Sequence, residues 1–513
     1  MTAVNAARFT PAAIAARVAG VAPREPVPNA RPPGWRNPTP RGPYQLLVIG
    51  SGPAGLMAAR VAAAAGARVA LVESHQLGGN RVNDGCIPSK TIIRSAQLYA
   101  EMRGAENFGV ASPAQVEVDF AAVMARMRRV RERLSRVDSA SRLTSAGIDL
   151  FFGRARFVGP DAVDVDGVRL GFRKALIATG SRALLPDVNG LAEVGFLTNE
   201  TVFDIQALPP SLLVVGGGPL GCELAQAFAR LGARTLLSHS EPLFLPKEER
   251  DAAQMVSDAL ARDGVEFHLN CRVVSVRAEG GRKRVEMISA GNVSTTLVDE
   301  ILTGIGRIPA VQGLGLEQAG VVYDAASGIQ VDDHLRTSNP RIYAAGDVCL
   351  EHQYTNTAEA SAQIVVRNAL LRGRRRMSAL TVPWCTYTDP QVAHVGLYVK
   401  QARERNIPVK TFTVPMHDVD RAIADGAEDG FVKIHVREGT DRILGATIVG
   451  RHAGELINCV SLAMVTGIGL RRLSTVIHAY PTQGEAIRQA AGACARSLAS
   501  PLVAWLERKW LQR

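Results

Sequence analysis

Two short glycine runs have the spacing that places backbone N–H groups against nucleotide phosphates. The first lies between the apolar run QLLVI and an alanine-rich stretch, and it consists of Gly50, Gly52, Pro53, Ala54 and Gly55. Glycines at these positions permit a tight strand-to-helix turn and a close approach of a pyrophosphate to the helix N-terminus. Glu73 ends the next apolar run, 23 positions beyond Gly50, where its carboxylate can accept from a ribose hydroxyl. The pattern predicts a dinucleotide site.

The second run has the same spacing and consists of Gly216, Gly218, Pro219, Leu220 and Gly221. Two such sites on one chain imply two nucleotides, and the simplest pair is FAD with a nicotinamide coenzyme. The following strand ends at Ser238, His239 and Ser240, so it offers no carboxylate to a 2′-hydroxyl and no arginine to a 2′-phosphate. These three side chains with Lys247 could serve a phosphate, whereas Glu241 could serve a hydroxyl. We therefore predict NADPH or NADH, with a preference for NADPH.

Strand and helix patterns alternate around both glycine runs. A cycle of apolar strand, glycine turn, helix and second strand covers residues 44–73 and recurs over residues 211–238. Such alternation predicts an α/β fold with two doubly wound, Rossmann-like domains. Beyond Val382 the pattern of mixed strands and helices predicts a separate C-terminal α+β domain. A charged helical stretch over residues 119–147 is expected to turn its basic side to solvent.

The composition of the chain is that of a large globular enzyme. Its 513 residues are 47% hydrophobic and 21% charged, which excludes a small scaffold and a mainly disordered chain. Seven cysteines, an odd number spread along the chain, favour a reducing compartment, so we expect a cytoplasmic protein. No apolar run approaches the ~20 residues of a membrane-spanning helix.

The formal net charge of +11 is concentrated at the two ends of the chain. Residues 1–43, with six arginines and one acidic residue, are expected to form a mobile Pro- and Ala-rich extension, although an acid-poor start is also typical of a transit peptide. Residues 496–513, with Trp505 and Trp510, predict a basic amphipathic helix that lies on a membrane surface or packs on the protein itself. No basic run is interleaved with aromatics in a recognisable module, so we expect no nucleic-acid partner.

Further motifs follow in the order found in one enzyme family. They are Gly78-Gly79, Gly85-Cys86-Ile87-Pro88-Ser89-Lys90, Ala178-Thr179-Gly180-Ser181, Glu223, Gly304-Ile305-Gly306-Arg307, Ala345-Gly346-Asp347, Tyr387 to Pro390, and His478-Ala479-Tyr480-Pro481 with Glu485. With these motifs the chain resembles the class I pyridine nucleotide-disulfide oxidoreductases, which include lipoamide dehydrogenase, glutathione reductase and mercuric reductase. The resemblance covers residues 44–493.

The resemblance implies how FAD would be bound. Cys86 would lie against the flavin, Asp347 would bond the ribityl chain, and Lys90, paired with Glu223, would lie beside the flavin ring. The cofactor-binding residues would also include Ser74, Gly78, Gly79, Asn80, Ala155, Thr179, Gly180, Ser181, Gly306, Gly346 and Thr355.

The resemblance also implies a domain order and a homodimer whose active sites are completed across the interface. The domains would be an extension (1–43), an FAD-binding domain (44–186), an NAD(P)-binding domain (187–308), a central segment that completes the FAD site (309–378), a dimerisation domain (379–495) and the basic tail (496–513).

The chain departs from the family pattern at the redox-active pair. Disulfide reductases of the family carry two cysteines five positions apart, and here Arg81 stands at the first position and Cys86 at the second. A guanidinium can neither attack sulfur nor be oxidised, so a dithiol relay is not expected. Cys86 is then either a vestigial thiol that tunes the flavin or a single-cysteine centre that cycles through a sulfenic acid, persulfide or mixed disulfide. A helix N-terminus, with Arg81 and Lys90 nearby, would favour its thiolate, and Arg81 could pair with an anionic substrate.

A second departure lies at Tyr480, where disulfide reductases place a histidine that is oriented by the residue matching Glu485. A phenol is a poor proton shuttle near neutral pH. His478 would be a substitute base or a structural residue. Tyrosine here is also similar to mercuric reductase, but that enzyme's paired C-terminal cysteines have no counterpart before Arg513, so mercury reduction is not expected. The residue pattern predicts no resident metal site.

The sequence therefore predicts an FAD-dependent NAD(P)H oxidoreductase with a non-standard small-molecule acceptor. Candidate acceptors are a quinone, an electrophile, or a small thiol or persulfide compound handled by Cys86. The expected catalytic residues are Arg81, Cys86, Lys90, Glu223, Tyr480 and Glu485. The alternatives are a lipoamide dehydrogenase-like or mercuric reductase-like activity on a specialised substrate, and a flavoprotein sensor or assembly partner with little turnover. Membrane contact is expected, if at all, through the basic tail.

Overall fold

The computed structural model describes residue 27, residues 29–111 and 117–499, residue 505 and residues 509–511. Most of the predicted N-terminal extension and of the predicted basic tail lies outside the described residues. The chain divides into two compact units. The first unit is Met1–Pro242 with Gly264–Leu380, and the second unit is Leu243–Asp263 with Thr381–Arg513. No helix in the described ranges is long and apolar enough to cross a membrane.

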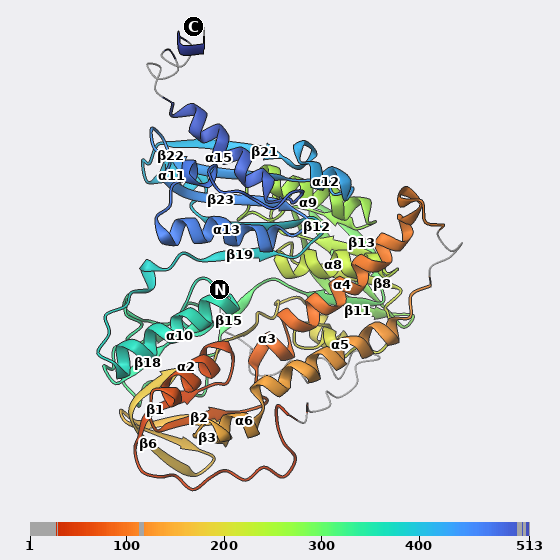
Figure 1. Cartoon of the computed structure of the whole chain (residues 1–513). Coiled ribbons are helices and arrows are strands. Elements are labelled where there is room, and N and C mark those ends of the chain that lie inside the picture. Colours follow the sequence, from red (N-terminus) through yellow and green to blue (C-terminus); the bar gives the residue numbers. More distant parts are fainter. Residues whose placement is uncertain (1–26, 28, 112–116, 500–504, 506–508, 512–513) are drawn as a thin grey trace. The chain divides into compact units, whose positions relative to one another are not determined.

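The first sheet of the first unit is built around the first glycine run (Figure 1). Its seven strands follow the order β3-β2-β1-β6-β5-β4, with β18 beside β6. The strands are β1 (Tyr44–Ile49), β2 (Val69–Glu73), β3 (Ile148–Phe152), β4 (Ala155–Gly159), β5 (Ala162–Val165), β6 (Val168–Ile177) and β18 (Ile342–Ala344). β3, β2, β1, β6 and β18 run parallel, as the alternating pattern predicts, while β4 and β5 extend the sheet as an antiparallel meander.

Strand β1 is buried on both faces, which explains its continuous apolar run. Leu46 and Val48 belong to a core that also contains residues of α2 (Pro53–Ala64) and α10 (Thr355–Leu370). Leu47 and Ile49 alternate with them along the strand, point to the opposite face of the sheet and belong to a second core. Helices α2 and α10 lie side by side (Figure 1).

The described residues between 29 and 43 pack on this sheet. Val27 and Ala30 are buried in its first core. The Asn37 amide closes the edge strand β3, because its Nδ2 donates to the Phe152 carbonyl at 2.9 Å and its Oδ1 accepts from the Phe152 N–H at 2.8 Å. Val27, Ala30 and Asn37 of the predicted extension are therefore anchored on this sheet, and the mobility of the extension stays a prediction.

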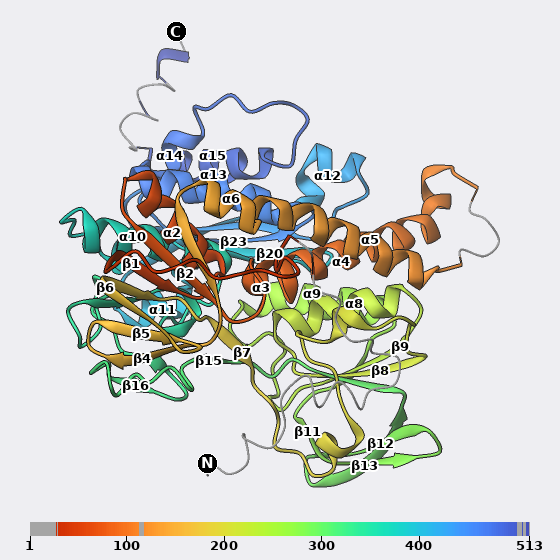
Figure 2. The same ribbon diagram turned by 90° about the horizontal axis from the view of Figure 1, so that it is seen from below.

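The second sheet of the first unit is built around the second glycine run (Figure 2). It is parallel with the order β10-β9-β8-β14, and a three-stranded antiparallel sheet β11-β12-β13 follows β10 in the chain. The elements are β8 (Ser211–Val215), α8 (Pro219–Arg230), β9 (Arg234–Ser238), β10 (Glu266–His268), β11 (Cys271–Glu279), β12 (Arg282–Ser289), β13 (Asn292–Val298) and β14 (Glu300–Thr303). The recurrence of a parallel sheet around a glycine turn confirms the two Rossmann-like domains.

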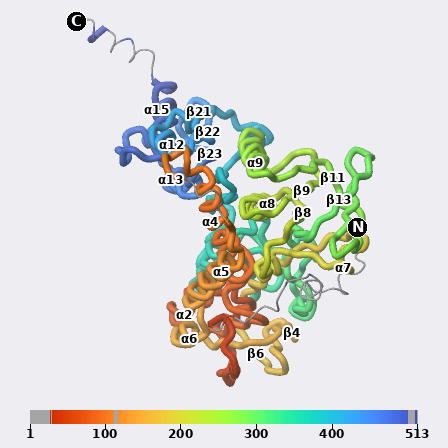
Figure 3. Tube along the Cα trace, turned by 90° about the vertical axis from the view of Figure 1, so that its right-hand side faces the viewer, coloured from red at the N-terminus to blue at the C-terminus, as the bar shows by residue number. Residues whose placement is uncertain are grey.

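Further helices and strands complete the first unit. They are α3 (Gly79–Asn83), α4 (Cys86–Arg103), α5 (Phe120–Ser135), α6 (Ala140–Ser145), α7 (Leu191–Val194), β7 (Ser181–Ala183) paired with β15 (Arg307–Pro309), and β16 (Tyr323–Asp324) paired with β17 (Gly328–Ile329). Helices α4 and α5 run side by side (Figures 1 and 3). Helix α5 buries Met124 and Met127 and exposes Arg128, Arg129 and Arg133, as its charge pattern predicts.

The second unit contains the predicted α+β domain. Its antiparallel sheet has the order β19-β20-β23-β22-β21. The strands are β19 (Pro383–Thr386), β20 (Gln391–Gly396), β21 (Val409–Pro415), β22 (Phe431–Arg437) and β23 (Ile443–Gly450), and the helices are α9 (Arg250–Arg262), α11 (Val399–Glu404), α12 (Asp420–Ala424), α13 (Ala453–Thr466), α14 (Leu470–Leu473) and α15 (Glu485–Ser497).

Helix α9 groups with this second unit, although the expected domain order places it in the NAD(P)-binding domain. The buried Glu248 just before α9 accepts from Trp384 Nε1 at 3.2 Å and from the Tyr398 hydroxyl at 2.7 Å. Glu249 accepts from Lys433 Nζ at 3.1 Å. These polar contacts hold the start of α9 on the second unit's own sheet and α11.

Candidate active site

The first glycine run forms the turn between β1 and α2. Gly50 has a φ of +99°, and a Cβ on it would overlap the Ala178 carbonyl oxygen. A Cβ on Gly55 would overlap the Gly50 carbonyl oxygen. Helix α2 begins with Pro53 and Ala54, and its N-cap, Gly52, supplies no side-chain cap, so the first N–H groups are available to an anion. This cradle fits the diphosphate of FAD.

Glu73 lies at the end of β2 with its carboxylate beside the glycine turn. Its Oε2 accepts from the Ser51 N–H at 2.9 Å and from the Ser51 hydroxyl at 2.6 Å. Its Oε1 accepts from the His75 N–H at 2.7 Å. The side chain is buried, so its charge is fixed in the place where a ribose hydroxyl would need an acceptor. The neighbouring Ser74 is exposed, and its carbonyl accepts from Arg31.

Several other predicted FAD residues converge on this region. A Cβ on Gly79 would meet Gly52 Cα at 2.6 Å, so the two loops are in contact. Asn80 Nδ2 donates to the Ser181 carbonyl at 3.2 Å, and the Ser181 hydroxyl donates to Asp347 Oδ2 at 2.6 Å. Positive φ angles occur at Gly78, Gly180 and Gly346. The structure therefore brings residues from four sequence motifs to one place.

Arg307 also belongs to this cluster, and the sequence motif in which it stands predicted no role for it. Its Nε donates to the Ser181 hydroxyl at 2.8 Å and its Nη2 to the Ser181 carbonyl at 2.8 Å. Its Nε also lies 4.0 Å from Asp347 Oδ2. Arg307 directly follows Gly306, which has a φ of +130°. Its position in the motif Gly304 to Arg307 was the one feature of the sequence that could have indicated a place in this cluster.

Two predicted FAD residues make contacts of another kind. The Thr179 hydroxyl donates to the Ala310 carbonyl at 2.8 Å, which ties two backbone segments together. Ala155 is half-buried at the start of β4 and packs against the second core of the first sheet. A role for either in binding FAD stays a prediction.

Cys86 is the first residue of α4, as expected, and its thiol is exposed. Its Sγ lies 3.6 Å from Oγ1 of Thr355, the first residue of α10. Two helix N-termini therefore meet at this thiol. Burial raises the pKa of the thiols of Cys222, Cys271, Cys349, Cys459 and Cys494. Of the seven cysteines, Cys86 alone is exposed.

Lys90 lies one turn after Cys86 on α4. Its Nζ is 2.7 Å from Oε2 of Glu223 on α8, whose side chain is 3% exposed. The ion pair implied by the family resemblance is therefore present. The ion pair joins α4, which belongs to the domain of the first glycine run, to α8, which belongs to the domain of the second. It lies near the end of α4 at which Cys86 stands.

Among the predicted catalytic residues, Arg81 has the contacts that differ most from those expected. Its Nη2 lies 2.5 Å from Asp138 Oδ2, and its Nη1 lies 3.8 Å from Glu359 Oε1. The Asp138 side chain is 1% exposed and also pairs with Arg60 at 2.8 Å. Asp138, and more distantly Glu359, pair with the guanidinium, so an anionic substrate would have to compete with these carboxylates, and its pairing with Arg81 stays a prediction. Asp138 lies 57 positions away, and no local pattern pointed to it.

Tyr480 and Glu485 lie in the second unit and do not contact each other in the way that the family pattern suggests. The Tyr480 side chain is 75% exposed, and its hydroxyl donates to Asp420 Oδ2 at 2.8 Å. That hydrogen bond raises the pKa of the phenol. Glu485 pairs with Arg488, whose hydrogen bond lowers the pKa of the carboxyl. The carboxylate that orients Tyr480 is therefore Asp420, a residue that the motif did not include.

The second glycine run repeats the geometry of the first. Gly216 has a φ of +118°, and a Cβ on it would meet the Gly304 carbonyl oxygen at 2.5 Å. A Cβ on Gly221 would overlap the Gly216 carbonyl oxygen. Gly218 is the N-cap of α8, which begins with Pro219 and Leu220 and has no side-chain cap. The same cradle for a diphosphate is therefore present a second time.

His239 occupies at the second site the place that Glu73 occupies at the first. The Gly217 N–H donates to His239 Nδ1 at 3.2 Å, as the Ser51 N–H donates to Glu73. A Cβ on Gly217 would lie 2.9 Å from the imidazole Cγ, so glycine permits this approach. Because Nδ1 accepts, the neutral ring carries its proton on Nε2. An imidazole thus replaces a carboxylate beside the turn.

The serines on either side of His239 differ in their availability. Ser238 is buried, and its hydroxyl donates to the Cys271 carbonyl at 3.1 Å. The expectation that it serves a phosphate is therefore wrong. Ser240 is exposed and remains a candidate.

Two family models match the chain. The model for pyridine nucleotide-disulphide oxidoreductases covers residues 44–363, and the model for the dimerisation domain of the same family covers residues 382–491. The second match supports a homodimer.

Named relatives are similar over most of the chain. A mercuric reductase of Lysinibacillus sphaericus is 34% identical over 87% of this chain and 82% of its own length. A dihydrolipoyl dehydrogenase of Thermus scotoductus is 34% identical over 88% of this chain and 97% of its own length.

Solved structures give the same result. LpdA from Mycobacterium tuberculosis is similar with a TM-score of 0.81 and 29% identity over 89% of this chain and 100% of that one. The HOCl-induced flavoprotein disulfide reductase RclA of Escherichia coli has a TM-score of 0.78 and 29% identity over 88% of this chain and 99% of that one. The chain therefore belongs to the class I pyridine nucleotide-disulphide oxidoreductases and is an FAD-dependent NAD(P)H oxidoreductase.

Proposed function

We propose that this enzyme passes electrons from NADPH through FAD to a small acceptor without a protein dithiol. The observation that carries the proposal is Arg81, which stands where the family's disulfide reductases carry the first cysteine and is held by Asp138 and Glu359. The remaining thiol, Cys86, has no second cysteine at the family spacing. A disulfide substrate would need such a pair to receive and release electrons.

The chain's own residues bind and orient the cofactors in this proposal. The turn at Gly50 holds the FAD diphosphate, Glu73 accepts from its ribose, and Asp347 serves the ribityl chain. When bound, FAD supplies the ring that takes a hydride from the nicotinamide and passes the electrons on. Lys90 adds positive charge beside that ring, and the buried Glu223 fixes the position of its ammonium.

Cys86 has one of two roles. As a redox centre its thiolate would attack the inner sulfur of a persulfide RSSH, which forms a mixed disulfide and releases hydrosulfide. Two electrons from the reduced flavin would then break the mixed disulfide, restore the Cys86 thiolate and release the thiol RSH. The exposed Sγ supports this role. As a vestigial thiol it would only adjust the flavin environment, and the acceptor would be a quinone or another electrophile. A quinone takes two electrons and two protons, and solvent can provide the second proton. In that case no covalent step at sulfur is required.

We infer NADPH as the coenzyme because an imidazole stands in the place of the ribose-binding carboxylate. A carboxylate would repel a 2′-phosphate, whereas a neutral imidazole would not. The exposed Ser240 is the residue proposed to contact that phosphate, and His239 leaves the site without a repelling carboxylate.

In the homodimer, Tyr480 is proposed to complete the active site of the other subunit. Its exposed side chain and its hydrogen bond to Asp420 support a positioned phenol at a surface that a partner can cover. A dihydrolipoyl dehydrogenase-like or mercuric reductase-like activity is the second candidate, favoured by the names of the relatives and opposed by Arg81. A sensor role with little turnover, a cytoplasmic location and membrane contact by the tail stay predictions.

Anaerobic stopped-flow reduction tests the proposal. Mixing the FAD-loaded enzyme with NADPH and with NADH should bleach the flavin, faster with NADPH, and failure with both coenzymes would overturn the assignment. An acceptor screen on the reduced enzyme then compares wild type with Cys86→Ser, with Cys459→Ser as the control thiol. Loss of turnover in Cys86→Ser alone selects the redox role of Cys86, and unchanged turnover selects the vestigial one.

A further inference from the structure

The loop that follows α10 is a strongly basic segment of the first unit. We define the arginine loop as residues 371–377; its sequence is LRGRRRM. The side chains of Arg372, Arg374, Arg375 and Arg376 are all exposed. Within the described ranges, the one acidic partner of these four is Asp333, whose Oδ2 lies 4.0 Å from Arg376 Nε. The loop therefore presents far more positive than negative charge.

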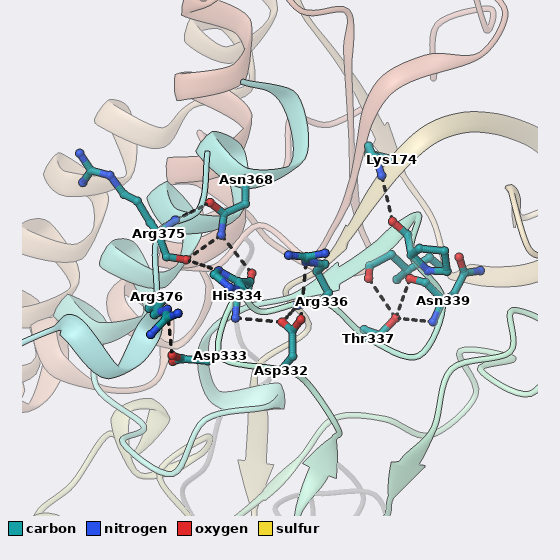
Figure 4. Close-up of polar contacts among 12 residues, drawn as sticks. Lys174, Asp332, Asp333, His334, Arg336, Thr337, Asn339, Asn368, Arg375 and Arg376 are labelled. Atoms are coloured by element: carbon teal, nitrogen blue, oxygen red, sulfur yellow. Dashed lines mark hydrogen bonds and ion pairs between the residues drawn. The ribbon is translucent and has the colours of Figure 1, made fainter. Parts of the chain in front are cut away.

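Neighbouring segments carry three further cations, two of which are paired with carboxylates. Arg336 Nε lies 3.5 Å from Asp332 Oδ2, and Arg341 Nη1 lies 3.2 Å from Asp161 Oδ2. Lys174 has no acidic partner among the described residues; its Nζ donates to a carbonyl, that of Pro340, at 2.9 Å. Burial lowers the pKa of Lys174, and the nearby charges of Arg336 and Arg341 lower it further. Figure 4 shows Arg336 turned toward Asp332 and Arg376 toward Asp333.

The backbone of the arginine loop is held firmly, although its side chains are exposed. Asn368 accepts from the Arg375 N–H at 2.9 Å and donates to the Arg375 carbonyl at 2.9 Å (Figure 4). His334 Nδ1 contacts the same carbonyl at 2.9 Å. The Met377 N–H donates to the Asp333 carbonyl at 2.8 Å. Arginines on a fixed backbone lose less conformational freedom on binding, which favours recognition of a partner.

The composition of the surface selects the class of partner. Arginine binds carboxylates in a bidentate manner. The arginine loop contains no aromatic residue on which a nucleic-acid base could stack. Its one exposed large apolar side chain is Leu371, which is too little to enter a bilayer. The exposed Asp332 and Asp333 would repel a uniform sheet of anionic headgroups but can be avoided by a polypeptide with carboxylates at fixed positions.

We propose that the arginine loop, with Arg336, Arg341 and Lys174, is a docking surface for an acidic polypeptide segment of a partner protein. This surface lies outside the glycine turns and the Cys86 region and does not depend on the identity of the electron acceptor. It also locates positive charge on the catalytic body, in addition to the two basic ends of the chain.

Binding of a fluorescein-labelled, glutamate-rich peptide to the FAD-loaded enzyme tests the proposal. The triple variant Arg374→Ala, Arg375→Ala, Arg376→Ala should weaken binding about tenfold or more at about 0.15 M salt. The matched control removes the same charge from α5 by Arg128→Ala, Arg129→Ala, Arg133→Ala, and it should bind nearly as well as wild type. Asn368→Ala keeps every charge but frees the loop backbone, and it should also weaken binding.

Three results would overturn the proposal. The first is equal weakening in the loop variant and the α5 variant, which would mean that only net charge matters. The second is an absence of saturable peptide binding by wild type. The third is tighter binding of phosphatidylserine vesicles or a single-stranded oligonucleotide than of the peptide, lost in the loop variant, which would assign the surface to another class of partner. Bleaching of the flavin by NADPH, measured on the same variants, is expected to be unchanged and reports on the proposed function separately.

Discussion

Arg81 and Asp138 form an ion pair with an Nη2 to Oδ2 distance of 2.5 Å. Arg81 lies on α3 and Asp138 just before α6, and the Asp138 side chain is 1% exposed. Arg60 on α2 contacts the same carboxylate at 2.8 Å. The residue that replaces a redox-active cysteine therefore ties α3 to two neighbouring segments. These contacts show that Arg81 links elements of the fold.

Removing Arg81 should lower stability more than it affects any substrate. Arg81→Ala leaves the buried Asp138 carboxylate with one guanidinium instead of two, which should reduce the free energy of unfolding by about 2 kcal/mol. Thermal unfolding of the FAD-loaded enzyme measures this loss, and Asp138→Asn should produce a similar one. A large rise in KM for an anionic acceptor with unchanged stability would restore Arg81 as a substrate-binding residue.

Breaking the pair of Lys90 and Glu223 should slow the reduction of the flavin. In Glu223→Gln the ammonium loses its nearly buried partner, so it is no longer fixed beside the flavin. Because Lys90 is partly exposed, the stability loss should be about 1 to 2 kcal/mol. Glu101→Gln breaks the exposed pair of Glu101 with Arg94 and should change neither stability nor rate measurably. Equal behaviour of the two variants would remove Lys90 from the proposed mechanism.

Changing His239 should change the coenzyme preference. His239→Glu restores a carboxylate beside the Gly217 N–H, so it should repel a 2′-phosphate and accept from a 2′-hydroxyl. We expect a shift of roughly tenfold or more in the ratio of affinities for 2′,5′-ADP and 5′-AMP, measured by calorimetry. These fragments report on the site even if no hydride is transferred. Ser240→Ala is the control for a general disturbance of the loop, and an unchanged ratio in His239→Glu would contradict the NADPH assignment.

Acid should destabilise the second unit through His394. Burial lowers the pKa of this histidine to about 3, and its neutral ring contacts Thr447 Oγ1 at 2.9 Å and the Gly396 carbonyl at 3.1 Å. Because the folded pKa is below the unfolded value of about 6.5, the stabilisation is complete above pH 6.5 and is lost as the pH falls toward 3, by at most about 1.4 kcal/mol per pH unit. Urea unfolding at several pH values measures this slope.

A variant without the titrating ring isolates the effect. His394→Gln should show a smaller pH dependence in this window. His417→Gln, which removes an exposed imidazole from the same unit, should keep the wild-type slope. Identical slopes in both variants would mean that other groups govern the acid sensitivity.

Local patterns allowed much of the fold and part of the site to be predicted. The glycine turns and Glu73 follow from strand, turn and helix periodicity, because each is specified within about 25 residues of chain, whereas the helix start at Cys86 was implied by the family resemblance. The partner of Arg81 could not be foreseen, because Asp138 reaches it only after the chain folds back. The contact of Asp420 with Tyr480 and the burial of Ala30 could not be foreseen for the same reason, because both join segments that are distant in the sequence. His239 was noted for a phosphate, but its hydrogen bond to Gly217 depends on a three-dimensional approach that the sequence does not display.

Reoxidation of the NADPH-reduced flavin is the most direct test of transfer without a dithiol. The reduced enzyme is mixed anaerobically with a short-chain quinone, an electrophile, a small persulfide, lipoamide or oxidised glutathione, and the return of flavin absorbance is followed. The account predicts fast reoxidation by at least one of the first three and none at turnover rates by lipoamide or oxidised glutathione. Fast reoxidation by either disulfide in the wild-type enzyme would contradict it.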